Sequence, residues 1–280
     1  MRIRQAVVAI AAVSATAVGV PVTASATGSG GADAVGLTHR GTALVKFDTD
    51  RPTKARKIGT VRGLVEDTRL VGIDRRVQNG KLYGVGNRGG IYTLSSRSAK
   101  ATPAGRLSTP LAGTSFGVDF NPAANALRVV SDTGQNLRQP FGTGDAATAA
   151  TVVDGSLNYL AVPATGVTGA AYTNNDLAAD TATSLFDLDT TLDQVALQSP
   201  ANAGSLAATG KLGVDAGSDA GFDIASRVRR GTTVGNTGYA VLSLGGRTGL
   251  YRVDLLTGDV AARGWFPVAV TDLAVDLDRR

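Results

Sequence analysis

The chain has 280 residues, with 28 lysines and arginines, 23 aspartates and glutamates, one histidine and no cysteine. Without cysteine it can form no disulfide, thiol nucleophile or cysteine–zinc site, and a single histidine rules out a metal site built from several histidines. The formal charge of +5 is too small to indicate a nucleic-acid-binding protein, so we expect no nucleic acid partner.

The first residues have the pattern of a signal peptide. Arg2 and Arg4 give a positive start, residues 6–20 are apolar, and Ala24-Ser25-Ala26 supplies the small residues that a signal peptidase requires. The apolar stretch is short for a membrane span, and no later segment is apolar enough for one. We therefore expect a secreted, extracellular protein with no membrane span after signal removal. The expected segments are a signal peptide at 1–26, a disordered linker at 27–34 and a single domain at 35–280.

Basic residues gather in two places, one shortly after the linker and one in the last fifth of the chain. Clusters of this kind usually form a solvated face, and we interpret both in that way. The first cluster is Arg51, Lys54, Arg56, Lys57 and Arg62, and the second is Arg227, Arg229 and Arg230.

Short apolar runs bounded by glycine, asparagine, aspartate or proline recur after residue 35, and no stretch shows a helical period. This pattern predicts an all-β protein. One three-residue opening returns about every 50 residues, and a four-stranded propeller blade needs about 40–50 residues. The openings are Gly72-Ile73-Asp74, Gly117-Val118-Asp119, Gly169-Ala170-Ala171, Gly221-Phe222-Asp223 and Asp272-Leu273-Ala274. The sequence therefore predicts a five-bladed β-propeller with about 50 residues per blade.

The two ends of the domain look like parts of one blade. Residues 36–41 match residues 84–89, and the strand that follows each is alike, so the first repeat has its later strands but no opening strand. Residues 268–277 form an opening strand with nothing after it. An unpaired sheet edge is a liability that ring closure removes. We therefore expect the C-terminal strand to complete the N-terminal blade.

Four segments of the repeats resemble a known family. They are Leu70–Asp74, Ser131–Arg138, Gly169–Asn175 and Gly221–Ile224, and Ser131–Arg138 is the most specific. They are similar to the secreted bacterial family called domain of unknown function 4394, over roughly residues 70–275. The resemblance implies a propeller-like secreted domain without an assigned activity.

No catalytic set can be assembled from the sequence. Residues 113–117, Gly-Thr-Ser-Phe-Gly, have the spacing of a nucleophile elbow, but that chemistry needs a strand, a turn and a helix. Here Ser115 precedes a strand, and His39, the one histidine, falls in a turn of another repeat. We therefore expect no catalytic residues and no cofactor, with a calcium ion as the one exception to consider.

Aspartates occupy one repeat position in three blades, at Asp74, Asp119 and Asp223, whereas Ala171 and Ala274 occupy it in the other two. Opening strands line the channel of a propeller, so the three carboxylates should converge on its axis. Three carboxylates in a water-filled channel could hold Ca²⁺, which takes oxygen ligands. The alternative is that each aspartate bonds nearby backbone amides and starts a turn.

Polar side chains also gather in two loops. Loops on one face of a propeller are where binding normally resides, so these side chains are candidate ligand contacts, although tight turns use the same residue types. The candidates are Asp132, Gln135, Asn136, Arg138, Asn174 and Asn175.

These features favour a secreted, non-catalytic extracellular binding or scaffold module whose partner is an unknown extracellular ligand or protein. The alternative is a metal-assisted hydrolase or lactonase with Ca²⁺ in the central channel, because a propeller can host such a site without histidine or cysteine. A purely structural envelope protein is a third reading.

Overall fold

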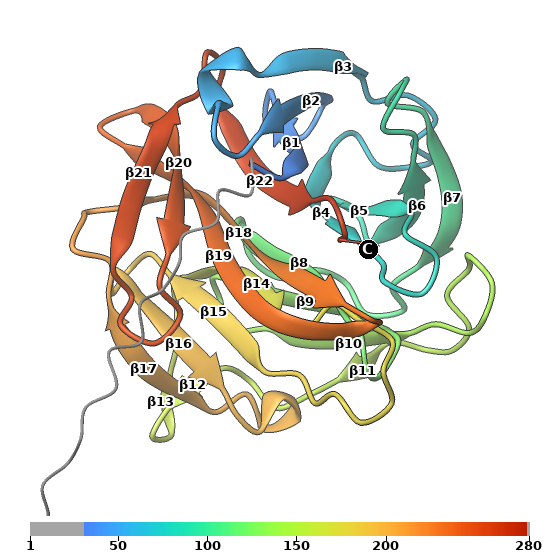
Figure 1. Cartoon of the computed structure of the whole chain (residues 1–280). Coiled ribbons are helices and arrows are strands. Elements are labelled where there is room, and N and C mark those ends of the chain that lie inside the picture. Colours follow the sequence, from blue (N-terminus) through green and yellow to red (C-terminus); the bar gives the residue numbers. More distant parts are fainter. Residues whose placement is uncertain (1–30, 279–280) are drawn as a thin grey trace, which may run out of the picture. The chain divides into compact units, whose positions relative to one another are not determined.

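The computed structural model describes residues 31–278, and these form five four-stranded antiparallel sheets around a common axis (Figure 1). The predicted all-β, five-bladed propeller is confirmed. Within residues 31–278 the helices are two short 3-10 turns, η1 (Pro52–Lys54) and η2 (Ala201–Ala203), and neither is long or apolar enough to cross a bilayer.

The blades are numbered one to five in chain order, with strands given from the axis outward. Blade one is β22 (Val270–Val275), β1 (Asp33–Thr38), β2 (Ala43–Asp48) and β3 (Arg56–Thr60). Blade two is β4 (Leu70–Arg75), β5 (Leu82–Gly86), β6 (Gly90–Leu94) and β7 (Ala101–Arg106). Blade three is β8 (Phe116–Asn121), β9 (Ala126–Ser131), β10 (Asn136–Pro140) and β11 (Val152–Val153).

Blade four is β14 (Val167–Tyr172), β15 (Leu185–Asp189), β16 (Gln194–Gln198) and β17 (Leu206–Lys211). Blade five is β18 (Gly217–Arg229), β19 (Thr232–Leu244), β20 (Arg247–Val253) and β21 (Val260–Trp265). A small hairpin of β12 (Asn158–Tyr159) and β13 (Val162–Pro163) lies in the connection from blade three to blade four.

The C-terminal strand closes the ring, as predicted. β22 pairs antiparallel with β1, with Ala34 opposite Val275 and Leu37 opposite Asp272. The predicted signal peptide and the first part of the predicted linker lie outside the described residues. The last two linker residues, Asp33 and Ala34, belong to β1 because they pair with β2, and Ala34 is buried. The first strand therefore begins at Asp33, two residues before the expected start of the domain.

Apolar side chains pack between neighbouring blades. Between blades two and three, the rings of Tyr83, Phe120 and Phe141 meet edge to face with centroids 5.1–5.6 Å apart. All three are buried in one cluster with aliphatic side chains of both blades. Each blade thus buries its faces against its two neighbours, and the ring is held by this stacking.

The recurrent glycine of the opening strands permits close contact between blades. A Cβ atom on Gly72 would lie 2.4 Å from Cγ2 of Val118, and one on Gly117 would lie 2.5 Å from the backbone nitrogen of Ala170. No side chain fits at these distances. The inner strands of blades two, three and four therefore approach one another more closely than any other residue would allow.

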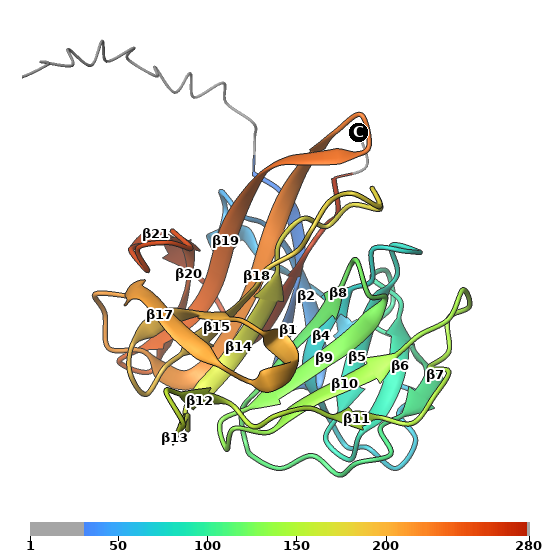
Figure 2. The ribbon, with the colours of Figure 1, turned by 90° about the horizontal axis from the view of Figure 1, so that it is seen from below.

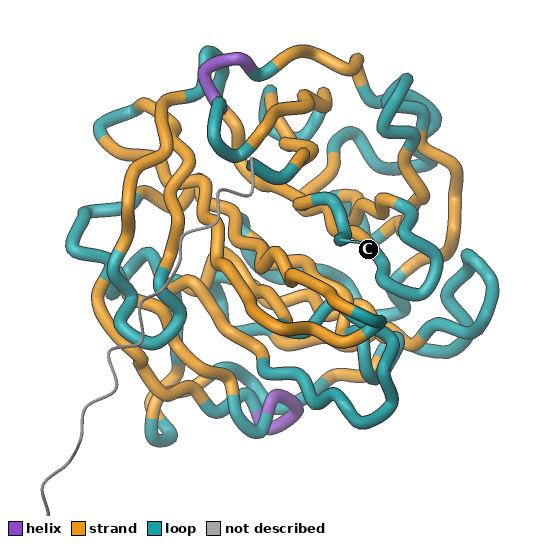
Figure 3. Tube along the Cα trace, viewed as in Figure 1, coloured by secondary structure: helices purple, strands orange, loops and turns teal. Residues whose placement is uncertain are grey.

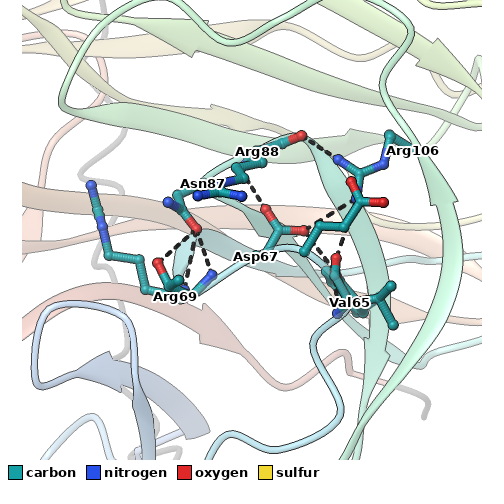
Figure 4. A network of polar contacts seen from close by, with 9 residues as sticks. Val65, Asp67, Arg69, Asn87, Arg88 and Arg106 are labelled. Atoms are coloured by element: carbon teal, nitrogen blue, oxygen red, sulfur yellow. Dashed lines mark hydrogen bonds and ion pairs between the residues drawn. The ribbon is translucent and has the colours of Figure 1, made fainter.

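A buried carboxylate fixes the segment that joins blade one to blade two (Figure 4). Asp67 accepts hydrogen bonds from the backbone nitrogen of Arg88 and from the hydroxyl of Tyr92, the latter at 2.6 Å. Asn87 Oδ1 accepts the backbone N–H of Arg69 at 3.2 Å. These bonds are structural, because they hold the connecting segment just before it enters β4, the inner strand of blade two.

Loops and turns join the strands around the ring (Figure 3), and because the strands of each blade are antiparallel these connections lie at the two ends of the strands. We call the face at which the inner strands β4, β8, β14, β18 and β22 end the exit face, and the opposite face the entry face. β18 and β19 have 13 residues each, and their hairpin projects beyond the rest of the ring (Figure 2). The exit face therefore carries the longest projecting hairpin of the described ring.

Candidate functional site: the channel and the exit face

The three predicted aspartates converge at the axis. Asp74, Asp119 and Asp223 are buried on β4, β8 and β18, and each offers one carboxylate oxygen. The three oxygens lie within 4.8 Å of one another. Equivalent positions on inner strands meet because every blade presents its opening strand to the same axis.

Each of these carboxylates also links its own blade to the next. Asp74 Oδ2 accepts the backbone N–H of Phe120 at 2.8 Å, and Asp119 Oδ1 accepts that of Tyr172 at 3.0 Å. Asp223 Oδ2 accepts the N–H of Val275 at 2.6 Å, across the closure of the ring. The alternative prediction placed the donor amides near each aspartate in its own turn, whereas the amides in these three bonds belong to the following blade. Asp223 also accepts the N–H of its neighbour Ile224.

A fourth aspartate, absent from the sequence-based set, completes the group. Asp272 on β22 accepts the backbone N–H of Ile73 at 2.7 Å, so it links blade one to blade two. It occupies the glycine position of the repeat, two residues before Ala274, which occupies the aspartate position. Because alternate residues of a strand point to one side, an aspartate two positions away can serve the same channel.

Among residues 31–278, no inner-strand aspartate links blade four to blade five. Ala171 occupies the aspartate position of blade four, and the N–H of Ile224 that it would face is bonded instead by Asp223 Oδ1 at 2.6 Å. Both oxygens of Asp223 therefore accept hydrogen bonds, one from an amide of its own strand and one from an amide of β22.

Burial raises the pKa of all four carboxyls. It raises the pKa of Asp223 to about 6, against hydrogen bonds that lower it. The pKa of Asp74 is raised well above its usual range by burial and then by the charge of Asp223. Burial and then the charges of Asp74 and Asp223 raise the pKa of Asp119, and burial raises that of Asp272. The group can therefore hold protons, or a cation in their place.

Two clefts open on the exit face. The larger, about 670 Å³, lies between blade one and the end of blade two. The smaller, about 350 Å³, lies over the ends of the inner strands near the β18–β19 hairpin. The larger is lined by Asp33, Ala34, Val35, Lys46, Phe47, Asp48, Arg51, Lys54, Arg56, Arg75, Ser96 and Asp276. The smaller is lined by Val77, Gln78, Asn79, Asn175, Asp176, Leu177, Val228, Gly231, Leu277 and Asp278.

The predicted contacts Asp132 and Gln135 lie on the entry face, in the turn between β9 and β10. Asp132 accepts hydrogen bonds from the backbone nitrogen and the hydroxyl of Thr114, at 2.9 and 2.6 Å. Gln135 accepts the N–H of Ala112 and donates to the carbonyl of Pro110, both at 2.9 Å. These bonds anchor the loop that carries the elbow-like residues 113–117.

Asn136 and Arg138 lie on β10 and belong to a buried polar network with Arg128. Asn136 Oδ1 accepts a bond from Arg128 at 2.6 Å, and Arg128 also pairs with Asp154 at 2.7 Å. Arg138 pairs with the same Asp154 at 3.0 Å. The network joins blade three to the connection leading into blade four.

Asn174 and Asn175 lie on the opposite face, after β14, and hold the β18–β19 hairpin. The backbone N–H of Asn174 donates to Asn236 Oδ1 at 3.1 Å, and Asn175 Nδ2 donates to the carbonyl of Ile224 at 2.9 Å. Asn175 also lines the smaller cleft. The six loop candidates are therefore divided between two faces and do not form one site.

Comparison with known proteins supports the fold. The family model for domain of unknown function 4394 matches residues 43–274, whereas no curated protein matches the chain. A chain of the Nidogen/Laminin complex is similar, with a TM-score of 0.52 and 11% identity, over 89% of this chain and 99% of that one. At this identity the likeness shows the fold alone.

Two bacterial structures are more distant. A protein of unknown function from Bacteroides thetaiotaomicron has a TM-score of 0.48 and 15% identity, over 89% of this chain and 65% of that one. An auxiliary nutrient binding protein from Bacteroides ovatus has a TM-score of 0.43 and 14% identity, over 63% of this chain and 46% of that one. The chain thus spans less than two thirds of both. Because the family model matches the chain from β2 to β22, the chain belongs to the family called domain of unknown function 4394.

Proposed function

We propose that the protein is a secreted, non-catalytic extracellular binding module whose ligand docks on the exit face of the ring. The observation that carries this proposal is the cleft of about 670 Å³ between blades one and two. Its volume falls within the range of about 300–1,000 Å³ in which ligand sites occur. Strands of two blades and η1 form its walls, so the site rests on a rigid scaffold.

The two clefts support a binding role at the exit face. The loop side chains expected from the sequence already serve the fold on both faces: Asp132 and Gln135 anchor the loop before β8, and Asn174 and Asn175 hold the β18–β19 hairpin. The exit face carries both clefts, and the open side of the larger one is lined by exposed side chains such as Lys54 and Ser96.

Obstructing the larger cleft tests this proposal. Ser96 is exposed and lines the cleft, whereas Ser98, two residues later, is exposed and does not line it. The purified mature protein would be screened by calorimetry against soluble anionic and neutral small molecules and oligosaccharides. Ser96→Trp should abolish binding of any ligand found, and Ser98→Trp should preserve it. A ligand that binds both variants equally would place the site elsewhere.

Export is a separate part of the proposal and has its own test. The signal-peptide pattern of residues 1–26 supports it. Expression of the full chain in a bacterial host should give a processed protein outside the cytoplasm, with an N-terminus near Thr27 by mass spectrometry. Full-length protein found only in the cytoplasm would contradict an extracellular role.

A metal-assisted hydrolase or lactonase is the second candidate, and the convergence of Asp74, Asp119 and Asp223 favours it. Calcium binds carboxylate oxygens at about 2.3–2.6 Å, and oxygens within 4.8 Å of one another can share one ion of that size. Each carboxylate has one oxygen bonded to the next blade, so each would coordinate through the other. For Asp223 this means giving up its bond to Ile224.

Calcium binding is tested best with Asp119→Asn, because an amide oxygen can still accept the N–H of Tyr172 while the negative charge is removed. If the ion binds, Ca²⁺ should raise the thermal midpoint of chelator-washed wild type and not that of the variant. Hydrolysis of esters or lactones that needs Ca²⁺ and is lost in Asp119→Asn would favour the enzyme. A wild-type midpoint indifferent to Ca²⁺ would remove this candidate.

A further inference from the structure

Two cations lie directly opposite each other in blade one. Lys46 on β2 and Arg56 on β3 are register partners, both are exposed, and both line the larger cleft. Directly opposed side chains on neighbouring strands have Cβ atoms about 4.5–5.5 Å apart, and like charges at that distance repel. The repulsion between these two side chains therefore destabilises blade one.

Lys46 and Arg56 form the second residue pair after the β-bulge between the third and the outermost strand of blade one. Blades two, four and five have a bulge at the same place, and the second pair after it contains no two cations. There Thr93 faces Thr102 in blade two, Leu197 faces Ala207 in blade four and Arg252 faces Ala261 in blade five. The fold therefore does not need two cations at this point, and the pair is specific to the cleft.

Most of the acids in the cleft are already neutralised. Asp48 pairs with Arg51 at 3.6 Å, and Asp276 pairs with Arg75 at 2.5 Å. Within residues 31–278, Lys46, Lys54 and Arg56 form no ion pair, and Asp33 is the remaining acid of the lining. The side chains that line the cleft therefore carry a surplus of positive charge.

We propose that this cleft binds a ligand with two or more negative charges, in which carboxylate, phosphate or sulfate groups lie between Lys46, Lys54 and Arg56. The inference rests on the proposed function, because it names the ligand class of the same cleft. Bound anionic oxygens would relieve the repulsion between Lys46 and Arg56 and gain charge-assisted hydrogen bonds. The basic cluster that sequence analysis interprets as a solvated face is, in this proposal, part of a binding site.

The direct test uses citrate and inorganic pyrophosphate as anionic probes and glucose as the neutral one, measured by calorimetry at low ionic strength. Wild type should bind at least one of the anions and not glucose, and added salt should weaken that binding. Arg56→Gln and Lys54→Gln should each weaken it about tenfold, the loss expected for one charge-assisted bond. Lys57→Gln, an exposed neighbour on β3 outside the lining, should leave it unchanged.

A second variant gives a readout without ligand. Lys46→Thr introduces the residue found at this position in blade two and removes the repulsion. It should raise the thermal midpoint of the ligand-free protein by about 1–2 °C at low salt and abolish the further rise caused by the anion. An unchanged midpoint together with an intact response to the anion would overturn the proposal.

The outcomes also separate this inference from the proposed function. A neutral ligand that wild type binds and Ser96→Trp does not would preserve the binding module and overturn the anionic ligand class. If neither anions nor neutral probes bind the cleft, both fail. Anion binding that Lys57→Gln weakens as much as Arg56→Gln would show general surface charge and also overturn the site.

Discussion

The ring contains two kinds of buried carboxylate, which differ in whether their oxygens accept hydrogen bonds. Asp119 on the inner strand of blade three is 2% exposed and accepts the backbone N–H of Tyr172 from the next blade. Asp187, on the second strand of blade four, is 0% exposed, and neither of its oxygens has a hydrogen-bond partner in the described structure. One carboxylate links two neighbouring blades, and the other is buried with no such bond in the described residues.

Their positions in the blade explain the difference. The residue that faces the middle of the opening strand from the second strand is Gly36, Gly84, Val129 and Ala240 in blades one, two, three and five. In blade four it is Asp187, which faces Ala170. The position is therefore small or apolar in every other blade, because it packs between sheets. A carboxylate is stabilising on the inner strand, where amides of the next blade reach it, and costly one strand further out.

Removing the last strand, β22, should have the largest effect on the stability of the ring. Deleting residues 268–280 removes Asp272, which accepts the N–H of Ile73, and Val275, which donates to Asp223. Two of the four carboxylate links would be lost together with the pairing of β22 and β1. We expect loss of cooperative thermal unfolding, measured by circular dichroism, with deletion of 279–280 alone as the control. Cooperative unfolding at an unchanged midpoint would contradict the closure.

The links themselves can be tested with a pair of substitutions at Asp119. Asp119→Leu leaves the N–H of Tyr172 buried without an acceptor, which should lower the free energy of unfolding by about 1–3 kcal/mol. Asp119→Asn retains an acceptor oxygen and should cost much less. Urea unfolding in the presence of a chelator measures both. Equal losses in the two variants would show that the charge of Asp119, rather than its role as an acceptor, matters.

The sequence predicted the ring well because its evidence is repeated. A similar three-residue opening returns five times at a near-constant interval, and the two incomplete ends complement each other, so several weak signals support one another. Convergence of Asp74, Asp119 and Asp223 followed from the same repeat. The bond from each carboxylate to the next blade did not follow, because it depends on the stagger between sheets, which no single repeat encodes.

Three features of the site were beyond sequence analysis for specific reasons. Asp272 was missed because it occupies the glycine position of its repeat. The opposition of Lys46 and Arg56 depends on the β-bulge after Leu44, which shifts the register of β2 and β3 by one residue. Asp187 alternates with Phe186 and Leu188, which in an ordinary sheet would place it on a solvated face, but both faces of a propeller blade are covered.

The smallest expected effect is a gain in stability at Asp187. Asp187→Ala, the residue of blade five at this position, removes a buried polar group without partners, a relief of about 1–3 kcal/mol that is partly offset by lost packing. We therefore expect a net gain of about 1 kcal/mol at neutral pH. Asp189→Ala is the matched control, and it should destabilise, because Asp189 accepts bonds from Tyr159 and from the N–H groups of Thr191 and Leu192.

The gain should depend on pH in a direction opposite to that of an ordinary aspartate. Burial raises the pKa of Asp187 well above its usual range, the nearby Arg128 lowers it, and Asp189 raises it. Above the pKa of about 4 in the unfolded chain, the folded protein binds the proton more tightly than the unfolded one, so rising pH costs wild type stability until the folded-state pKa is passed. Asp187→Ala lacks this loss. Its advantage, measured by urea unfolding, should therefore be smallest near pH 4 and grow toward neutral pH, and an advantage that shrinks as the pH rises would mean that Asp187 is ionised and compensated in the folded ring.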